Sequence, residues 1–305
     1  MLFYVSMPPS SGYGSLRMPM NVGKVQNQGV EFDVEAVLVS TKNIEWSVYG
    51  NITYVDGKVL RLPESYLKDD GTRWYAGSSY ILKEGGSLHQ AYMPEYAGVD
   101  AETGKALYYL DPADHSKGTT ATYSQDLAGD LGDISVKCYG GFGTSLNLYG
   151  VDLGVQFAYQ FGGKAYDGTY QEMMHAGDKP GHIWSVDILN AWTPENTETD
   201  VPRLCASDSY DQQTSSRWLV SSNYLSLNNV TVGYTLPSKW TNKIGVSKAR
   251  VFFQGDNLAL FSARQGYDPR QTQNALSYGV GISTSTGNFV YSLTRTFSGG
   301  ISISF

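Results

Sequence analysis

The last seven residues of the chain, 299–305, alternate between apolar and polar side chains. Ile301, Ile303 and Phe305 fall on one face of a strand, and the intervening serines fall on the other. A soluble domain rarely ends on an exposed aromatic residue, because termini are usually polar and frayed. One face of an outer-membrane barrel strand contacts lipid, and aromatic residues line the membrane interface. The segment therefore predicts either the closing strand of a membrane barrel or a strand packed in a soluble β-sandwich.

Composition favours a β-rich fold. The 305 residues include 34 Gly and 23 Tyr, and only 17% are charged; aromatic residues favour strands, and glycine serves turns and crowded pleats. No stretch approaches the roughly 20 apolar residues that a membrane helix needs, which excludes a helical membrane protein. The net charge of -7 and the pI of about 5.1 argue against a nucleic-acid partner.

Period-two alternation recurs along much of the chain and predicts antiparallel strands. In residues 151–162, six apolar side chains at period two span about 11 residues, the length of a tilted membrane strand. A further strand end is predicted at the first five residues. The predicted strands cover residues 28–40, 44–55, 136–148, 151–162, 223–236, 248–258, 276–282, 289–297 and 299–305.

Long polar insertions separate the predicted hairpins, at about residues 60–135, 163–222 and 259–275. Loops of this length are unusual in compact domains and are usually functional. Short turns at one end and long loops at the other are typical of outer-membrane barrels. A lectin-like sandwich with decorated loops is the alternative.

Sequence motifs for catalysis are absent. The chain contains no nucleophile elbow, phosphate loop, zinc-protease motif or Cys-x-x-Cys motif. The four histidines lie in the predicted long loops without metal-ligand spacing. We therefore expect no enzyme activity, no metal and no cofactor. Cys138 and Cys205 lie far apart in sequence, and their pairing cannot be decided, although two unpaired thiols are favoured.

Three carboxylates, Glu31, Asp33 and Glu35, occupy alternate positions of one predicted strand. Glycosidases use pairs of carboxylates at controlled separations, but three in a row are more typical of the hydrated inner wall of a barrel. Aromatic residues are also frequent in the long loops, where they could stack on sugar rings or peptide side chains, or pack the loops together. They are Trp74, Tyr75, Tyr80, Tyr92, Tyr96, Trp184, Trp192 and Tyr210.

Several segments, in order along the chain, resemble the SusC/RagA-type TonB-dependent transporters. Residues 21–31, NVGKVQNQGVE, match an N-x-G-x-x-x-N-x-G-x-E hairpin of that family, and residues 250–258, RVFFQGDNL, match a later strand. Each segment is weak evidence alone, and their order makes the resemblance specific. The other matching segments are residues 80–87, 96–100, 103–104, 157–164, 192–197, 202–203, 224–237 and 266–269.

The resemblance implies an all-β fold, an antiparallel transmembrane β-barrel segment with long extracellular loops. It implies import of oligosaccharides or peptides across the outer membrane, with a SusD-like surface lipoprotein and the TonB complex as partners and outer-membrane lipid around the barrel. Trp74, Tyr75, Tyr92, Trp184 and Trp192 are then candidate ligand-binding residues, and Phe305 is a candidate assembly signal. A soluble secreted β-sandwich that binds carbohydrate remains the alternative, and a surface hydrolase is disfavoured.

The resemblance extends from about residue 21 to residue 305. Members of the family close with about 22 strands around a plug domain, whereas nine or ten strands are predicted here. We therefore expect residues 1–305 to be the C-terminal portion of the barrel, without the plug domain and the N-terminal strands. The first residues lack the pattern of a signal peptide, so an outer-membrane location would require an export signal outside this chain.

Overall fold

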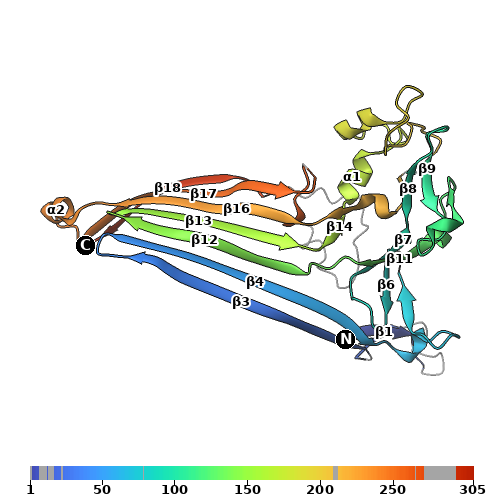
Figure 1. Ribbon diagram of the computed structural model, residues 1–305, viewed down its shortest axis with the longest axis horizontal. Coiled ribbons are helices and arrows are strands. Elements are labelled where there is room, and N and C mark those ends of the chain that lie inside the picture. The colour runs from blue at the N-terminus through green and yellow to red at the C-terminus, as the bar shows by residue number, and fades with distance from the viewer. Residues whose placement is uncertain are drawn as a thin grey trace.

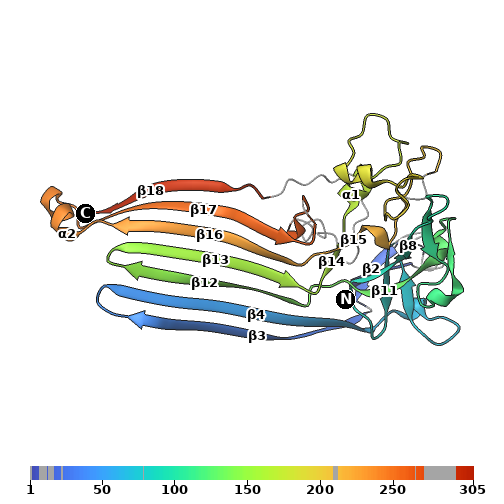
Figure 2. The ribbon, with the colours of Figure 1, turned by 45° about the horizontal axis from the view of Figure 1, so that its top comes forward.

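Seven long antiparallel strands form one curved sheet in the computed structural model (Figures 1 and 2). Each strand hydrogen-bonds to the long strand that follows it in the chain. In order across the sheet they are β3 (Lys24–Ser40), β4 (Ile44–Arg61), β12 (Cys138–Leu148), β13 (Val151–Phe161), β16 (Tyr224–Thr235), β17 (Lys248–Ser262) and β18 (Thr296–Ser304). The structure describes residues 2–6, 12, 17–21, 23–77, 79–208, 212–264, 266–270 and 293–305.

The connections differ strongly between the two ends of the sheet. At one end, residues 41–43 join β3 to β4, and the two residues Tyr149 and Gly150 join β12 to β13. Both of these have positive φ, as a tight two-residue hairpin requires. Residues 62–137 and 162–223 form long connections at the other end, as Figure 2 shows. The predicted asymmetry between short turns and long loops is confirmed.

The two faces of the sheet differ in chemistry. Paired residues share a face, so the register places apolar residues of all seven strands on one side. Several of these side chains remain 56–71% exposed: Val30, Phe32, Phe253 and Ile301. A β-sandwich would bury such residues against a second sheet, and no second sheet covers them in the described part of the chain. The sheet is therefore a segment of a barrel wall with an apolar outer face.

Several strand limits differ from those predicted. Residues 296–304 form the single strand β18, so the predicted break between 289–297 and 299–305 is wrong. The glycines at the break fit a strand because a Cβ on Gly300 would lie 2.6 Å from the ring of Phe252. β3 begins earlier and β4 and β17 end later than predicted. The predicted strand 276–282 and residues 289–292 lie outside the described residues.

The alternation within residues 28–40 predicts that Val30, Phe32, Val34, Ala36 and Leu38 share one face, and this row needs one correction. Val30, Phe32, Val34 and Ala36 share the outer face as expected, but the register shifts between Val37 and Val39. Val39 therefore pairs with Trp46, and Leu38 is the extra residue of a β-bulge rather than the next member of the row.

The long connections carry secondary structure of their own (Figure 1). β5, β6, β7 and β11 form one small sheet, β8 to β10 form a second, and β1 pairs with β2. No helix in the described ranges is long and apolar enough to cross a membrane. The remaining strands and helices are β1 (Leu2–Ser6), β2 (Arg17–Asn21), β5 (Trp74–Ala76), β6 (Tyr80–Lys83), β7 (Gln90–Pro94), β8 (Tyr96–Val99), β9 (Ala106–Tyr109), β10 (Thr119–Thr120), β11 (Ala128–Asp133), β14 (Lys164–Tyr166), β15 (Leu219–Ser221), α1 (Gly168–Met173) and α2 (Ser238–Thr241).

The first two long loops pack on each other around Trp218. This side chain is fully buried, and its indole N–H donates to the carbonyl of Gln213 at 2.9 Å. Met93 of β7 in the first loop and Met174 of the second loop belong to the same apolar cluster. Because most of the large buried side chains lie in this cluster and in a smaller one around Leu62, the apolar core is at the loop end rather than between layers of the long sheet.

Candidate functional site: the polar wall and the external loops

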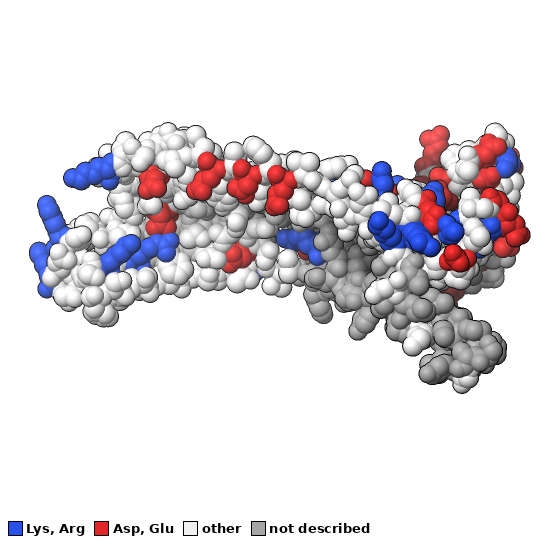
Figure 3. All heavy atoms as spheres, turned by 90° about the horizontal axis from the view of Figure 1, so that it is seen from below, with Lys and Arg blue, Asp and Glu red and all other residues white. Residues whose placement is uncertain are grey.

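The inner face of the sheet forms a polar wall. Glu31, Asp33 and Glu35 stand along β3, and the register places them opposite Thr53, Asn51 and Tyr49 of β4. Figure 3, which views the sheet from below, shows acidic side chains in a row along this edge. All three carboxylates are exposed. Their placement agrees with the prediction of a hydrated wall.

Hydrogen bonds between side chains continue the wall on β16 and β17. The amide of Asn229 donates to Asp256 at 2.6 Å, and Thr231 donates to the Asn229 oxygen at 2.9 Å. Gln254 contacts both carboxylate oxygens of Asp256 at 3.0 Å. These residues therefore have fixed side-chain positions and present amide, hydroxyl and carboxylate groups to the inner side.

An ion pair spans the wall near the short-turn end. Arg250 of β17 reaches across β16 to Asp152 of β13, with Nε 2.9 Å from Oδ1. Gly233 lies between them, and a Cβ there would come within 2.5 Å of both carboxylate oxygens. Glycine is thus required for this contact between non-adjacent strands.

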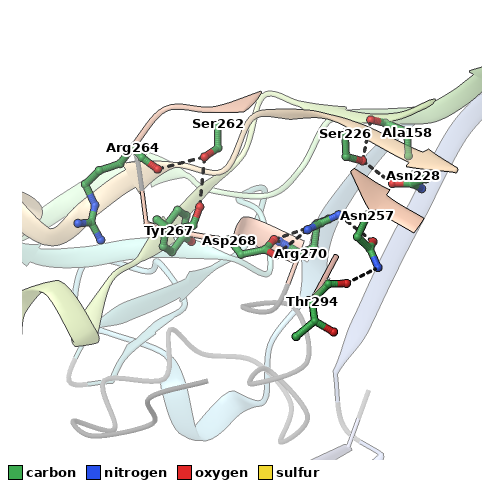
Figure 4. A network of polar contacts seen from close by, with 10 residues as sticks. All are labelled: Ala158, Ser226, Asn228, Asn257, Ser262, Arg264, Tyr267, Asp268, Arg270 and Thr294. Carbon is green, nitrogen blue, oxygen red and sulfur yellow. Dashed lines mark hydrogen bonds and ion pairs between the residues drawn. The ribbon is translucent and has the colours of Figure 1, made fainter. Parts of the chain in front are cut away.

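A polar network holds the base of the third long connection, residues 263–295 between β17 and β18 (Figure 4). Asp268 and Arg270 form a two-point ion pair, with both N–O distances at 2.8 Å. Arg270 also donates to the Asn257 side chain at 3.4 Å, and Asn257 donates to the carbonyl of Thr294 at 3.3 Å. Asn257 has a φ of 54°, a conformation that asparagine tolerates better than most residues. Asn257, a bulged residue of β17, therefore contacts this connection both near its start, at Arg270, and at its end, at Thr294.

Arg264 joins the third connection to the second. Its guanidinium pairs with Asp167, which is 3% exposed, and lies 3.9 Å from the centre of the Tyr170 ring. Ser262 donates to the carbonyls of Arg264 and Tyr267, each at 3.1 Å (Figure 4). Burial, followed by a hydrogen bond to Asp187, raises the pKa of Tyr170 to about 12, so this phenol stays protonated at neutral pH.

The predicted ligand-binding aromatics of the first loop lie on the small sheet of β5, β6, β7 and β11. Trp74 is partly buried, with the Lys68 ammonium 4.3 Å from its ring centre. Tyr75 is more exposed and contacts the Tyr66 and Tyr80 rings. The other predicted aromatic of this sheet, on β7, is the partly buried Tyr92.

The predicted aromatics of the second loop are anchored by hydrogen bonds. Trp184 donates to the carbonyl of His175 at 2.8 Å and stacks on its ring at 5.0 Å. Trp192 donates to the carbonyl of Ala101 at 3.1 Å. No ring contact joins any two of the five predicted residues, all of which are described. The structure thus gives these two indoles packing roles, and Tyr210 lies outside the described residues.

An ion cluster joins the first loop to the sheet. Lys137 lies 2.6 Å from Asp133 and 2.8 Å from Asp56. Burial raises the pKa of Asp133, but hydrogen bonds from Lys137 and Ser135 outweigh it and bring the pKa to about 2. The carboxylate is therefore charged in the folded loop at any pH above about 3, and it stabilises the junction through Lys137.

This junction should weaken in acid. The folded pKa of Asp133, about 2, is lower than the ordinary value of 3.8, so its contribution is full above about pH 4 and is lost as the pH falls towards 2. We expect residues 128–137 to open more readily by about 2 kcal/mol at pH 2 than at pH 6, measured by hydrogen exchange corrected for intrinsic rates. The variant Lys137→Gln should lose most of this pH dependence; an unchanged dependence would contradict the assignment.

Metal binding has no visible centre among the residues that the structure describes. No group of three or more His, Cys, Asp or Glu side chains there could hold a metal ion. Cys138 and Cys205 are both free thiols. The site is a wall with two chemically different faces and an ordered set of loops at one end, an arrangement suited to holding and passing a solute.

Comparisons with known proteins agree with this architecture. No protein-family model matches the chain. The TonB-dependent receptor P3 of Formosa agariphila is 26% identical over all of this chain, which covers 31% of that protein. The TonB-dependent receptor SusC of Bacteroides thetaiotaomicron is 22% identical over 87% of the chain, which covers 26% of SusC. The chain therefore spans about a third or less of the length of these relatives.

Solved structures of the RagAB peptide transporter show the same fold. One of them superposes with a TM-score of 0.77 at 28% sequence identity. The superposition covers all of this chain and 32% of the solved chain. The "open-open" state of the RagAB peptide importer gives the same TM-score at 27% identity. In sequence and in fold, the chain corresponds to the C-terminal part of the barrel of a SusC/RagA-like TonB-dependent outer-membrane transporter.

Proposed function

We propose that this chain forms part of the wall of an outer-membrane nutrient importer. The observation that carries the proposal is the sheet with an apolar outer face and a polar inner face, closed by short turns at one end and by packed loops at the other. Such a wall separates lipid from a water-filled path. The names of the relatives, receptors and transporters, support the same class of activity.

The proposed partners follow from the relatives. A SusD-like surface lipoprotein would sit on the loop end, and the TonB complex would act through parts of the protein outside these residues. Oligosaccharides or peptides are the proposed cargo, with Trp74, Tyr75, Tyr92, Trp184 and Trp192 as candidate contacts. We favour the exposed Tyr75 over Trp192, since the indole N–H of Trp192 is already hydrogen-bonded within the loops. Phe305, which is 93% exposed beyond the end of β18, is the proposed assembly signal.

Uptake by cells tests the proposal. In a strain that lacks the full-length gene, we expect uptake of labelled oligopeptides or oligosaccharides to be lost, and complementation to restore it. The variant E31Q/D33N/E35Q should import cationic peptides several-fold more slowly than the wild type does, with neutral peptides unaffected, because the wall loses the negative potential that concentrates cations.

The matched control removes three exposed loop carboxylates instead, as E102Q/E195Q/E198Q, with the same change in charge. This control should leave the preference for cationic peptides unchanged. Unaltered uptake of both peptides and oligosaccharides after deletion of the gene would contradict the proposed function.

A further inference from the structure

The connection between β16 and β17, residues 236–247, is unlike the other turns at its end of the sheet. A two-residue turn suffices between β12 and β13, whereas this connection uses twelve residues and folds into α2 followed by a 3-10 turn, Asn242–Ile244. Figure 1 shows α2 projecting beyond the strand ends, next to the C-terminus. We call residues 236–247 the α2 turn. Its length exceeds what a hairpin needs, so the extra residues have another role.

The α2 turn packs on the outer, apolar side of the sheet. Ala249 shares the outer face with Val251 and Ile303, which are 46% and 51% exposed. Ala249 itself is only 7% exposed, and Val246 and Thr241 of the α2 turn are also buried. The α2 turn therefore covers the first outward residue of β17. This places its own exposed side chains at the boundary between the membrane and water.

Two exposed apolar side chains lie on the α2 turn. Trp240 is 61% exposed and Ile244 is 75% exposed. Trp240 lies in α2, and Ile244 ends the 3-10 turn that follows it. Tryptophan is enriched where a barrel crosses the membrane interface, since its ring is apolar and its N–H is polar.

Three lysines lie close in sequence to these apolar residues. Lys239 and Lys243 are four residues apart and exposed, and Lys248 follows at the start of β17. Residues 236–249 contain no Asp or Glu, although the whole chain has a net charge of -7. None of the three lysines has a carboxylate within ion-pair distance in the described residues. Figure 3 shows basic side chains gathered at this end of the sheet.

We propose that the α2 turn is a membrane-interface anchor that binds anionic phospholipid. The Trp240 and Ile244 side chains insert between acyl chains, and the Lys239 and Lys243 ammonium groups contact lipid phosphates. Short turns of outer-membrane barrels lie on the periplasmic side, so the lipid belongs to that leaflet. The lysines favour an anionic lipid over a zwitterionic one, because they are attracted to its negative headgroup. The tryptophan adds affinity for the membrane interface.

Native mass spectrometry of the full-length protein in detergent, with added phosphatidylglycerol or phosphatidylcholine, tests the anchor. We expect a preference for phosphatidylglycerol on the order of tenfold, because each lysine adds attraction to anionic lipid. The variant K239Q/K243Q should abolish this preference, and K24Q/K164Q, with the same charge change at the loop end, should retain it. Heat-modifiable migration on gels shows that each variant is folded.

Equal binding of the two lipids by the wild-type protein would overturn the proposal, as would an undiminished preference in K239Q/K243Q. A photo-cross-linking residue at position 240 in cells distinguishes the occupants of this surface. Adducts with lipid support the anchor, whereas adducts with a periplasmic protein would replace it with a protein-docking site.

Discussion

Replacing Trp218 with alanine should open the packed external loops while leaving the long sheet folded. The side chain is fully buried, Tyr170 packs edge-on at 6.0 Å, and the Arg217 guanidinium lies 4.6 Å from its ring centre. Truncation of a buried tryptophan costs about 3–5 kcal/mol. Because the cluster joins two loops rather than two layers of the sheet, the loss should appear as local opening.

Limited proteolysis and hydrogen exchange measure this effect. Peptides from residues 90–94 and 166–174 should lose protection together, while β12 and β13 keep theirs. Trp184→Ala is the control, since Trp184 is 49% exposed and contributes one indole hydrogen bond and one stacking contact. Equal effects of the two substitutions would show that Trp218 does not organise the loops.

Placing an arginine on the outer face of β17 should destabilise the barrel far more than placing one on the inner face. Phe253 is 56% exposed on the outer face, stacked on Phe297 at 6.0 Å, whereas Gln254 points to the inner face and contacts Asp256. Arginine on the lipid face near the membrane centre costs about 2–4 kcal/mol. Arginine at 254 remains in water beside a carboxylate.

Urea unfolding of the full-length protein in lipid vesicles, followed by heat-modifiable migration, measures the difference. Phe253→Arg should lower the free energy of unfolding by about 2–4 kcal/mol. Gln254→Arg should change it by no more than about 1 kcal/mol. Because the two positions are adjacent in β17, both variants place the arginine at nearly the same depth in the membrane. Both also add the same charge. Similar losses would mean that the two faces do not differ in environment.

The alternation in the sequence was sufficient to predict most long strands, because one face of each strand is apolar and the other is polar. β13 illustrates this, since the predicted range 151–162 differs from the structure by one residue. Strand ends were harder to predict. β4 continues through Asp56, Gly57 and Lys58 to Arg61 because its hydrogen bonds to β3 continue there, although these residues have no apolar alternation.

The organisation of the loops depends on contacts that the sequence does not encode locally. The backbone N–H of Tyr96 donates to the hydroxyl of Ser216 at 2.9 Å, across 120 residues. Trp218 has no periodic pattern around it, so the sequence does not identify it as the centre of the loop core. The aromatic residues selected from the sequence were found in the loops, but residue type alone could not separate packed rings from exposed ones.

The central claim is that the outer face of this sheet contacts lipid and the inner face contacts water. Single spin labels at residues 250–255 of the full-length protein, in a Cys138→Ser and Cys205→Ser background, test it by accessibility to oxygen and to a water-soluble nickel complex. Positions 251, 253 and 255 should be accessible to oxygen only, and positions 250, 252 and 254 to nickel. Position 252 is the most informative one. The apolar side chain of Phe252 would by itself predict contact with lipid, whereas the strand register places it on the inner, water-facing side. Oxygen-only access at 252, or no alternation along β17, would contradict the account.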